Sequence, residues 1–170
     1  MTMNNSWGYN PSDRHYKSVR SLINTLSEVA AKGGRLLLNV SPRGDGSLAE
    51  EQTGRLDAIA AWMAESSESI VGTQPGLEPW QFYGPSTRRE SRVYLHLLAR
   101  PYDTISVRGV HLRKIREASV LASGERLRIH RRGVVTEIMF NQDPVGELII
   151  DVPENAIAPP QTVIALDFYP

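Results

Sequence analysis

The fold of this chain is decided by the stretch Gly33-Gly34-Arg35-Leu36-Leu37-Leu38-Asn39-Val40-Ser41-Pro42-Arg43-Gly44-Asp45-Gly46-Ser47. Its apolar run, 36–40, is short and is bounded by paired glycines on one side and a Pro-Arg-Gly-Asp-Gly turn on the other. This pattern is typical of a strand that is buried on both faces. Such strands belong to parallel sheets covered by helices. We therefore predict an α/β unit with a helix on each side of strand 35–40.

Helical patterns flank this strand. Asn10-Pro11-Ser12-Asp13 predicts a helix start, with Asn10 as the cap and Pro11 in the first turn. Apolar residues then recur at helical spacing as far as the end signal Gly33: Tyr16, Val19, Leu22, Ile23, Leu26, Val29 and Ala30. After the strand, Ser47-Leu48-Ala49-Glu50 has the form of a capping box. A second stripe follows and fades at Ser66-Ser67: Gln52, Leu56, Ile59, Ala60 and Met63.

The pattern changes after Gly76, where the helical period disappears. Short runs of β-branched and aromatic residues, separated by Gly, Pro, Asn and Asp, predict a small antiparallel β-sandwich. The predicted strands are 80–83, 93–98, 104–107, 126–129, 134–140, 146–152 and 162–168. Segment 72–76 is interpreted as a hinge, so we expect an α/β part in residues 1–72 and an all-β sandwich in residues 77–170.

The amino-acid composition excludes several classes of function. The 170 residues include 19 Lys and Arg, 19 Asp and Glu, and no cysteine. Balanced charge argues against a nucleic-acid or membrane-surface partner, and the lack of cysteine excludes disulfides, thiolate catalysis and Cys-type zinc sites. The polar start, 1–6, has no secretory signal pattern, and no apolar run approaches the roughly 20 residues that span a bilayer. We therefore expect a cytoplasmic chain as it stands.

The histidines give no metal pattern. His15, His96, His111 and His130 are scattered, without the spacing that places two ligands one helical turn apart. We predict no metal site and no cofactor. The locally basic stretch 108–132 is interrupted by Glu117 and Glu125, and its alternating arginines indicate the solvated face of a strand rather than a nucleic-acid site.

Two loops supply the candidate substrate-contacting residues Trp7, Tyr9 and Asp45. Asp45 follows the predicted strand, where barrel enzymes place their active sites. Its glycine neighbours favour a turn instead, and no second carboxylate pairs with it as glycoside chemistry requires. Trp7, in Trp7-Gly8-Tyr9, can stack on the apolar face of a sugar or plug the end of a core. The pattern alone leaves both alternatives open.

Several motifs resemble the α-L-fucosidases, in order along almost the whole chain. They are Met1 to Asn10, Gly33 to Pro42 with Asp45-Gly46, Ile59 to Trp62, Glu68 to Thr73, Pro79-Trp80 and Val93 to Leu97. The resemblance implies that residues 1–72 are the last part of a catalytic (β/α)8-like barrel and that residues 77–170 are the C-terminal β-sandwich. It also implies a retaining glycosidase that hydrolyses terminal α-L-fucose from fucosylated glycans or aryl α-fucosides. In such an enzyme Trp7 lines the fucose pocket.

In that family the aspartate nucleophile and the glutamate acid/base stand upstream of the Trp-Gly-Tyr motif, so neither has a counterpart here. We therefore expect no catalytic residue in this chain and no activity from it alone, with the missing barrel portion as a partner. Without barrel neighbours, residues 1–72 are expected to be poorly ordered alone or to fold back onto the sandwich. Two alternatives stay open. One is a non-catalytic carbohydrate-binding module that uses Trp80 and Tyr83, and the other is a structural module that completes a separately encoded barrel.

Overall fold

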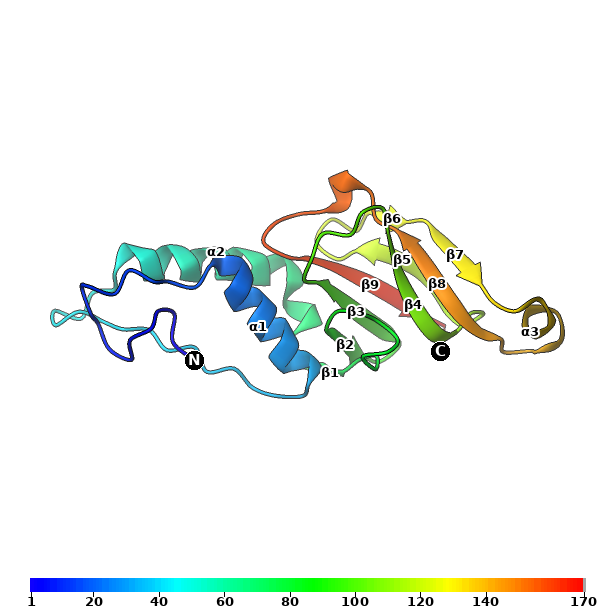
Figure 1. Cartoon of the computed structure of the whole chain (residues 1–170), viewed down its shortest axis with the longest axis horizontal. Coiled ribbons are helices and arrows are strands. Elements are labelled where there is room, and N and C mark those ends of the chain that lie inside the picture. Colours follow the sequence, from blue (N-terminus) through cyan, green and yellow to red (C-terminus); the bar gives the residue numbers. More distant parts are fainter. Residues whose placement is uncertain (170) are drawn as a thin grey trace.

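The computed structural model describes residues 1–169. The molecule is elongated, with two helices and the N-terminal segment at one end and an antiparallel β-sandwich at the other (Figure 1). Its helices are α1 (Val19–Ala31), α2 (Glu50–Ser66) and α3 (Val135–Phe140), with short 3-10 helices at Ser67–Ser69 and Glu154–Ala156. Within the described residues, none of the helices has the length and apolar character needed to cross a membrane.

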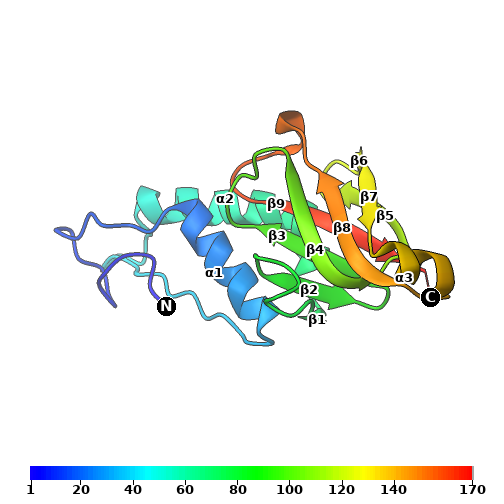
Figure 2. The ribbon, with the colours of Figure 1, turned by 45° about the vertical axis from the view of Figure 1, so that its right-hand side comes forward.

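The sandwich consists of two antiparallel sheets. Its strands within residues 1–169 are β1 (Gln74–Pro75), β2 (Ser86–Arg89), β3 (Arg92–Leu97), β4 (Thr104–His111), β5 (Ile115–Val120), β6 (Arg126–Leu127), β7 (Ile129–Arg132), β8 (Val145–Asp151) and β9 (Thr162–Phe168). The larger sheet has the order β1-β2-β3-β9-β5-β6, and the smaller sheet has the order β4-β8-β7. The smaller sheet lies in front of the larger one in Figure 2.

The main core lies between the two sheets and follows from the period of two along each strand. In β3, Val93, Leu95 and Leu97 point into this core, and Ile164 and Leu166 of β9 do the same. The smaller sheet contributes the facing side chains Ile105, Val107, Val110, Leu148 and Ile150. Each such side chain contributes about 1.5–3 kcal/mol on burial, so this core carries most of the stability of the sandwich.

A second core lies on the opposite face of the larger sheet, where α1 and α2 cover it. The alternate residues of the same central strands, Tyr94, Val163 and Ala165, pack against Ile23 of α1 and Trp62 of α2. The two central strands β3 and β9 are therefore buried on both faces. The helical part of the chain folds back onto the sandwich, which was one of the two outcomes expected for residues 1–72.

Both N-terminal helices begin differently from the prediction. Helix α1 begins at Val19, not near Pro11, and the Ser18 side chain caps it by accepting a hydrogen bond from the Ser21 backbone N–H. Asn10 instead closes a turn, in which its Oδ1 accepts from the Ser12 N–H at 3.0 Å. Helix α2 begins after Ala49 with no side-chain cap, because the Ser47 hydroxyl donates to Asp45. The capping-box prediction was wrong.

The stripe predicted for α2 is only partly buried. Gln52 is buried, Leu56, Ile59 and Met63 are half-buried, and Ala60 is exposed. The buried apolar anchor of the helix is Trp62, which lay outside the predicted stripe.

The strand predicted at 35–40 does not form a buried ladder. Leu37 is 79% exposed, and the only pairing among the described residues is one parallel bridge between Thr2 and Asn39. A strand buried on both faces needs neighbours on both edges and a covering layer, and the described residues offer only the extended N-terminal segment. The strands that are buried on both faces in this structure are β3 and β9.

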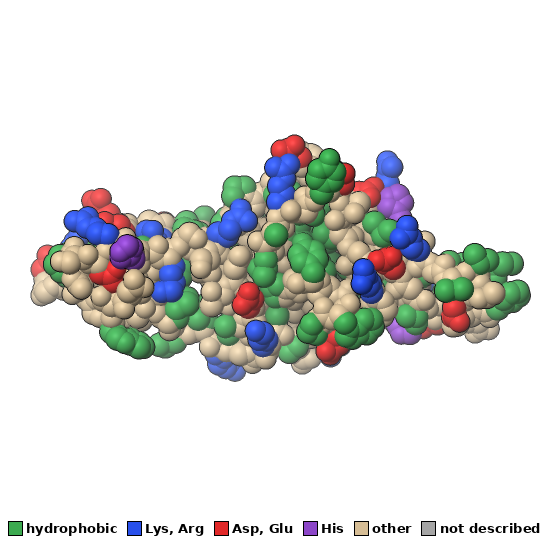
Figure 3. Space-filling model, viewed as in Figure 1, with side chains coloured by type: hydrophobic (Ala, Val, Ile, Leu, Met, Phe, Trp, Pro, Cys, Tyr) green, Lys and Arg blue, Asp and Glu red, His purple; other side chains and the backbone are tan. Residues whose placement is uncertain are grey.

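Two predicted strands were wrong in type. Residues 80–83 form a turn between β1 and β2, and residues 134–140 contain helix α3. Helix α3 is closed locally by the hydrogen bond from Ile138 N–H to Val134 O, and the Arg113 guanidinium donates to the Ile138 carbonyl. Its apolar side chains are exposed at the end of the molecule opposite the N-terminal segment (Figure 3). Strands β2 and β5 were not predicted.

The predicted strands at 93–98, 104–107, 126–129, 146–152 and 162–168 correspond to β3, β4, β6 with the start of β7, β8 and β9. The proposed hinge, 72–76, contains β1, which pairs with β2. The larger sheet therefore begins inside this segment. The division of the chain at this point stays a prediction.

Gly109 is expected to resist substitution. It sits at a β-bulge between Val107 and Val110 with a φ of +61°, and an added Cβ would lie 2.3 Å from Cη2 of Trp80. Gly109→Ala is expected to lower the free energy of unfolding by about 1–2 kcal/mol, because an L residue in the left-handed region costs about that much. The Trp80 ring is largely exposed and can move. The double variant Gly109→Ala/Trp80→Ala, measured by urea denaturation, should therefore retain the backbone part of the loss, and full recovery would contradict this account.

Candidate functional site

The N-terminal segment is fastened to the extended segment 36–40. The Met1 ammonium group donates to Leu37 O at 2.8 Å, and the Asn39 N–H donates to Met1 O at 2.8 Å. Met3 and Asn4 are buried, and Met3 O accepts from the Lys17 N–H at 2.8 Å. These contacts fix the backbone that leads into Trp7.

Trp7 combines a fixed backbone with a free side chain. Its carbonyl accepts from Asn39 Nδ2 at 2.8 Å and from the Ser41 hydroxyl at 3.3 Å, while its side chain leaves the residue 79% exposed. The indole is therefore not part of either core of the described residues. A sugar contact by Trp7 stays a prediction.

Asp13 holds the same loop from the other side. Its carboxylate accepts from the Ser6 hydroxyl at 2.8 Å and from the backbone N–H groups of Asn5 and His15. The hydrogen bond from Ser6 is the main cause that lowers the pKa of this carboxyl below its ordinary value. Asp13 is a structural acceptor, although the sequence pattern placed it in the first turn of a helix.

Tyr9 lies against the next loop, 41–49. The guanidinium carbon of Arg43 is 5.5 Å from the centre of the Tyr9 ring, which is a cation–π distance. Arg43 Nη1 also donates to Leu48 O at 2.9 Å and to the Ser47 hydroxyl at 3.3 Å. A small cavity of about 150 Å³ opens beside this pair, and its lining includes Asp13, Arg14 and Glu51.

Asp45 acts as a turn residue in this structure. Its Oδ1 accepts from the Ser47 backbone N–H at 2.9 Å and from the Ser47 hydroxyl at 2.7 Å. These hydrogen bonds, the one from the hydroxyl first, lower the pKa of the Asp45 carboxyl. Oδ2 of Asp45 is the oxygen that this turn leaves available for a ligand. A substrate contact by Asp45 stays a prediction.

Four carboxyl groups of the described residues have pKa values lowered by their surroundings. A glycosidase needs one carboxyl group whose pKa is raised so that it can protonate the leaving group. Among the described residues, the four carboxyl groups with a resolved pKa shift, Asp13, Asp45, Glu147 and Asp167, all shift downward. Burial raises the pKa of Asp167, but its ion pairs with Arg92 and Arg116 outweigh that effect. No group of three potential metal-ligating side chains occurs in residues 1–169.

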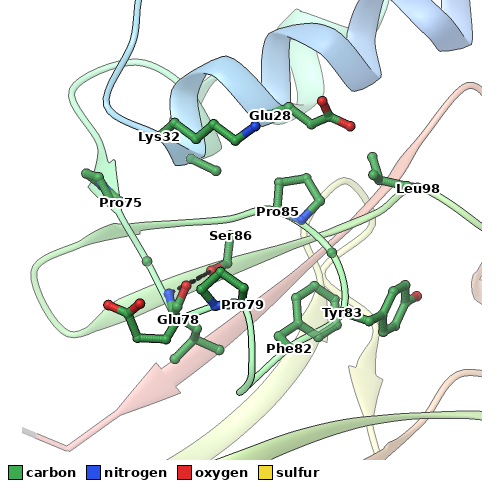
Figure 4. A pocket seen from close by; sticks show the side chains of 14 residues that line it. Glu28, Lys32, Pro75, Glu78, Pro79, Phe82, Tyr83, Pro85, Ser86 and Leu98 are labelled. Carbon is green, nitrogen blue, oxygen red and sulfur yellow. Dashed lines mark hydrogen bonds between the residues drawn. The ribbon is translucent and has the colours of Figure 1, made fainter.

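A separate groove lies where α1 meets the sandwich (Figure 4). It has a volume of about 330 Å³, with Glu28 and Lys32 of α1 on one side and Pro79, Phe82 and Tyr83 on the other. Burial raises the pKa of the Tyr83 hydroxyl. Trp80 is 65% exposed and lies over Gly109. The two aromatic residues of the binding-module alternative are thus both accessible, and only Tyr83 lines the groove.

Known proteins match both halves of the chain. The family described as alpha-L-fucosidase matches residues 1–68. Tissue alpha-L-fucosidase of Mus musculus is 25% identical over 173 residues, which cover 96% of this chain and 34% of that protein. Among solved structures, alpha-L-fucosidase isoenzyme 1 from Paenibacillus thiaminolyticus superposes with a TM-score of 0.83 and 28% identity over 100% of this chain and 39% of that one. The alpha-fucosidase of Thermotoga maritima gives a TM-score of 0.78 and 27% identity, over 98% and 38%.

Over nearly its whole length this chain is similar to α-L-fucosidases. The structural match runs through the helices and the sandwich alike, so the fold corresponds to the end of the fucosidase barrel followed by its C-terminal β-sandwich. The chain spans about a third of the length of the curated fucosidases that it matches over most of its own length. The lack of neighbours around segment 36–40 agrees with this coverage.

Proposed function

We propose that this chain forms the C-terminal third of a retaining α-L-fucosidase that hydrolyses terminal α-L-fucose from fucosylated glycans. Trp7 carries the proposal, because a fixed backbone presents its indole to solvent next to the end of segment 36–40. The related Thermotoga maritima enzyme has been solved in complex with fucose and with a mechanism-based inhibitor. The sugar class assigned here follows from that relationship.

The indole of Trp7 would contact the apolar C–H face of the fucose ring, which aromatic side chains commonly recognise. Retaining hydrolysis uses two carboxyl groups about 5–5.5 Å apart, one as nucleophile and one as acid/base. The described carboxylates with lowered pKa values, of which Asp13 and Asp45 lie nearest Trp7 in sequence, are engaged as structural acceptors. The resemblance implies that the nucleophile and the acid/base stand upstream of the Trp7-Gly8-Tyr9 motif, so residues 1–170 alone should leave aryl α-fucosides intact.

A chimera tests this proposal. Residues 1–170 replace the matching C-terminal part of the Paenibacillus thiaminolyticus enzyme, whose fold they share, and hydrolysis of 4-nitrophenyl α-L-fucoside is measured. We expect an active chimera, and Trp7→Ala should lower kcat/KM on the order of a hundredfold, or about 2.7 kcal/mol of transition-state stabilisation. Trp7→Phe keeps an aromatic face and should retain more activity.

Trp80→Ala is the matched control, because it removes an exposed indole that lies over Gly109 in the sandwich. A folded chimera that hydrolyses no fucoside, or one in which Trp7→Ala and Trp80→Ala are equally active, would overturn the proposal. Circular dichroism and gel filtration establish folding in each case. Turnover by residues 1–170 alone would contradict the placement of both catalytic carboxylates elsewhere.

A second candidate function is non-catalytic carbohydrate binding by the sandwich. The groove at Tyr83 favours it, because an accessible aromatic side chain beside three prolines offers an apolar wall of the size of a small ligand site. Calorimetry with fucose and fucosylated oligosaccharides separates the two functions. Heat that Tyr83→Ala abolishes and Trp7→Ala preserves would favour the module, whereas the barrel assignment expects no heat at this groove.

A further inference from the structure

Arg43 makes contacts with two loops at once. Through Nη1 it holds Leu48 O and the Ser47 hydroxyl of its own loop, and its guanidinium plane lies near the ring of Tyr9. The backbone of the loop is also closed, since the Arg43 N–H donates to Ser47 O at 2.8 Å. Arg43 therefore joins the loop 41–49 to the Trp7-Gly8-Tyr9 segment.

We propose that Arg43 and Tyr9 form the subsite for the leaving group, and that Arg43 positions Tyr9 to select a hydroxyl-rich leaving group over an aryl one. This inference rests on the proposed function. It assigns to the residues beside Trp7 a role in specificity, whereas Trp7 itself contacts the fucose.

The location follows from chain geometry. Tyr9 is two residues beyond Trp7, so their Cα atoms are at most about 7 Å apart. The group that leaves is bonded to the sugar, and it must therefore lie within a similar distance of the sugar ring. Gly8 leaves open space between the two aromatic residues, because a Cβ added there would meet no atom within 4 Å. The Tyr9–Arg43 pair is thus within reach of a leaving group attached to a fucose at Trp7.

The chemistry of the pair favours hydroxyl groups. A guanidinium has five N–H donors, and Arg43 uses only Nη1 toward a carbonyl or hydroxyl of its own loop. Arg43 forms no ion pair closer than 4.0 Å within the described part of the chain. The donors that neither this loop nor Tyr9 engages can bind hydroxyl oxygens of a second sugar. The adjacent cavity of about 150 Å³ is lined in part by the polar side chains of Asn10, Arg14 and Glu51 and has room for water that hydroxyl groups can replace.

The electrostatics are consistent with this role. The contact with Tyr9 is the main cause that raises the pKa of Arg43, so the cation is retained at any physiological pH. The carboxylates whose charges act on Arg43 are Asp45, which accepts from Ser47, and Glu51, which pairs with Arg14 at 3.9 Å; neither forms an ion pair with Arg43 within the described residues. The cation is therefore held over Tyr9 and remains available to a ligand.

The test uses the chimera described above with two substrates, a fucosyl disaccharide and 4-nitrophenyl α-L-fucoside. Arg43→Ala should lower kcat/KM for the disaccharide roughly tenfold through a higher KM, a change of about 1.4 kcal/mol, with kcat retained. The aryl fucoside should lose less, since its leaving group offers Arg43 a ring and nitro oxygens but no hydroxyl groups. Arg43→Lys keeps the charge without the planar fork and should recover only part of the loss. Arg20→Ala, on the exposed side of α1, is the matched control.

Equal loss on both substrates would show that Arg43 acts only on loop structure, and no loss on either would remove it from the site. Both results overturn the inference while leaving the proposed function intact, whereas an inactive but folded chimera overturns the proposed function. If the chimera is inactive, a second measurement tests whether Arg43 positions Tyr9. In residues 1–170 alone, the ¹⁵N heteronuclear NOE of the Tyr9 amide should fall in Arg43→Ala and not in Arg20→Ala. An unchanged value would overturn the inference.

Discussion

Replacing Trp62 by alanine is expected to lower the free energy of unfolding by about 3–5 kcal/mol, the range found for large aromatic residues in cores. Trp62 is 5% exposed and packs between α1 and the outer face of β3 and β9. Its indole N–H also donates to the Gln161 backbone carbonyl at 2.9 Å, so the variant leaves a buried acceptor without its donor. A loss of this size is a large part of the total of about 5–15 kcal/mol typical of a domain.

The loss of stability in Trp62→Ala should affect helices α1 and α2 more than the sandwich. Amide hydrogen exchange of Trp62→Ala is expected to show faster exchange throughout α1 and α2, while β4 and β8, which face the other core, keep their protection. Trp7→Ala is the matched control for urea denaturation, because the Trp7 side chain is largely exposed and its removal opens no cavity. Coincident denaturation midpoints for the two variants would show that the helices are not stabilised by this contact.

The sequence predicted the two central strands and missed others, among them β5, whose Ile115, Ala118 and Val120 pack on the main core. Residues 93–98 and 162–168 are rich in apolar and β-branched side chains, and they form the central strands β3 and β9. The polar strand Ser86–Arg89 was missed because pairing with β3, rather than its own side chains, keeps it extended. Residues 134–140 have the composition of a strand, yet local hydrogen bonds and Arg113 stabilise a helix with no buried residue. Propensity does not decide such cases, because tertiary contacts override it.

The candidate site was found through motifs, and its geometry was not predictable from them. Trp7 and Tyr9 were singled out, but their loop is held by Asn39, Ser41 and Asp13 through contacts that no spacing rule describes. Arg43 was not singled out at all. Arg43 lies in the glycine-rich turn that follows segment 36–40, and both this turn and the Trp7-Gly8-Tyr9 motif belong to the fucosidase resemblance. That shared membership is the signal that could have found it. The error at 36–40 has a related cause, since a strand pattern shows what a segment can pair with and not whether those partners are present.

Acidification from pH 6.5 to pH 4 is expected to remove about 3 kcal/mol of stability through one buried histidine. His96 lies in β3 and has no exposed surface, and burial lowers its pKa from 6.5 to about 4, although a hydrogen bond with Gln161 partly offsets that effect. The unfolded chain takes up a proton as the pH falls below 6.5, and the folded chain does not do so until about pH 4. Stability is therefore complete above pH 6.5 and falls by up to about 1.4 kcal/mol for each pH unit below it.

Protonation of His96 should destabilise the junction between the helices and the sandwich, because its hydrogen-bond partner Gln161 also bonds to both helices. Its Nδ1 is 3.1 Å from Gln161 Oε1, which also accepts from the Ser27 hydroxyl of α1, and the same glutamine accepts from Trp62 through its backbone. Urea denaturation at several pH values should show a steeper decline for the wild-type chain than for His96→Gln, whose amide cannot titrate. His15→Gln, at an exposed histidine, should follow the wild-type curve. Parallel curves for the wild-type chain and His96→Gln between pH 6.5 and pH 4.5 would contradict the assignment, because Asp13, Glu147 and Asp167, whose pKa values are lowered, lose their stabilising charge only below that range.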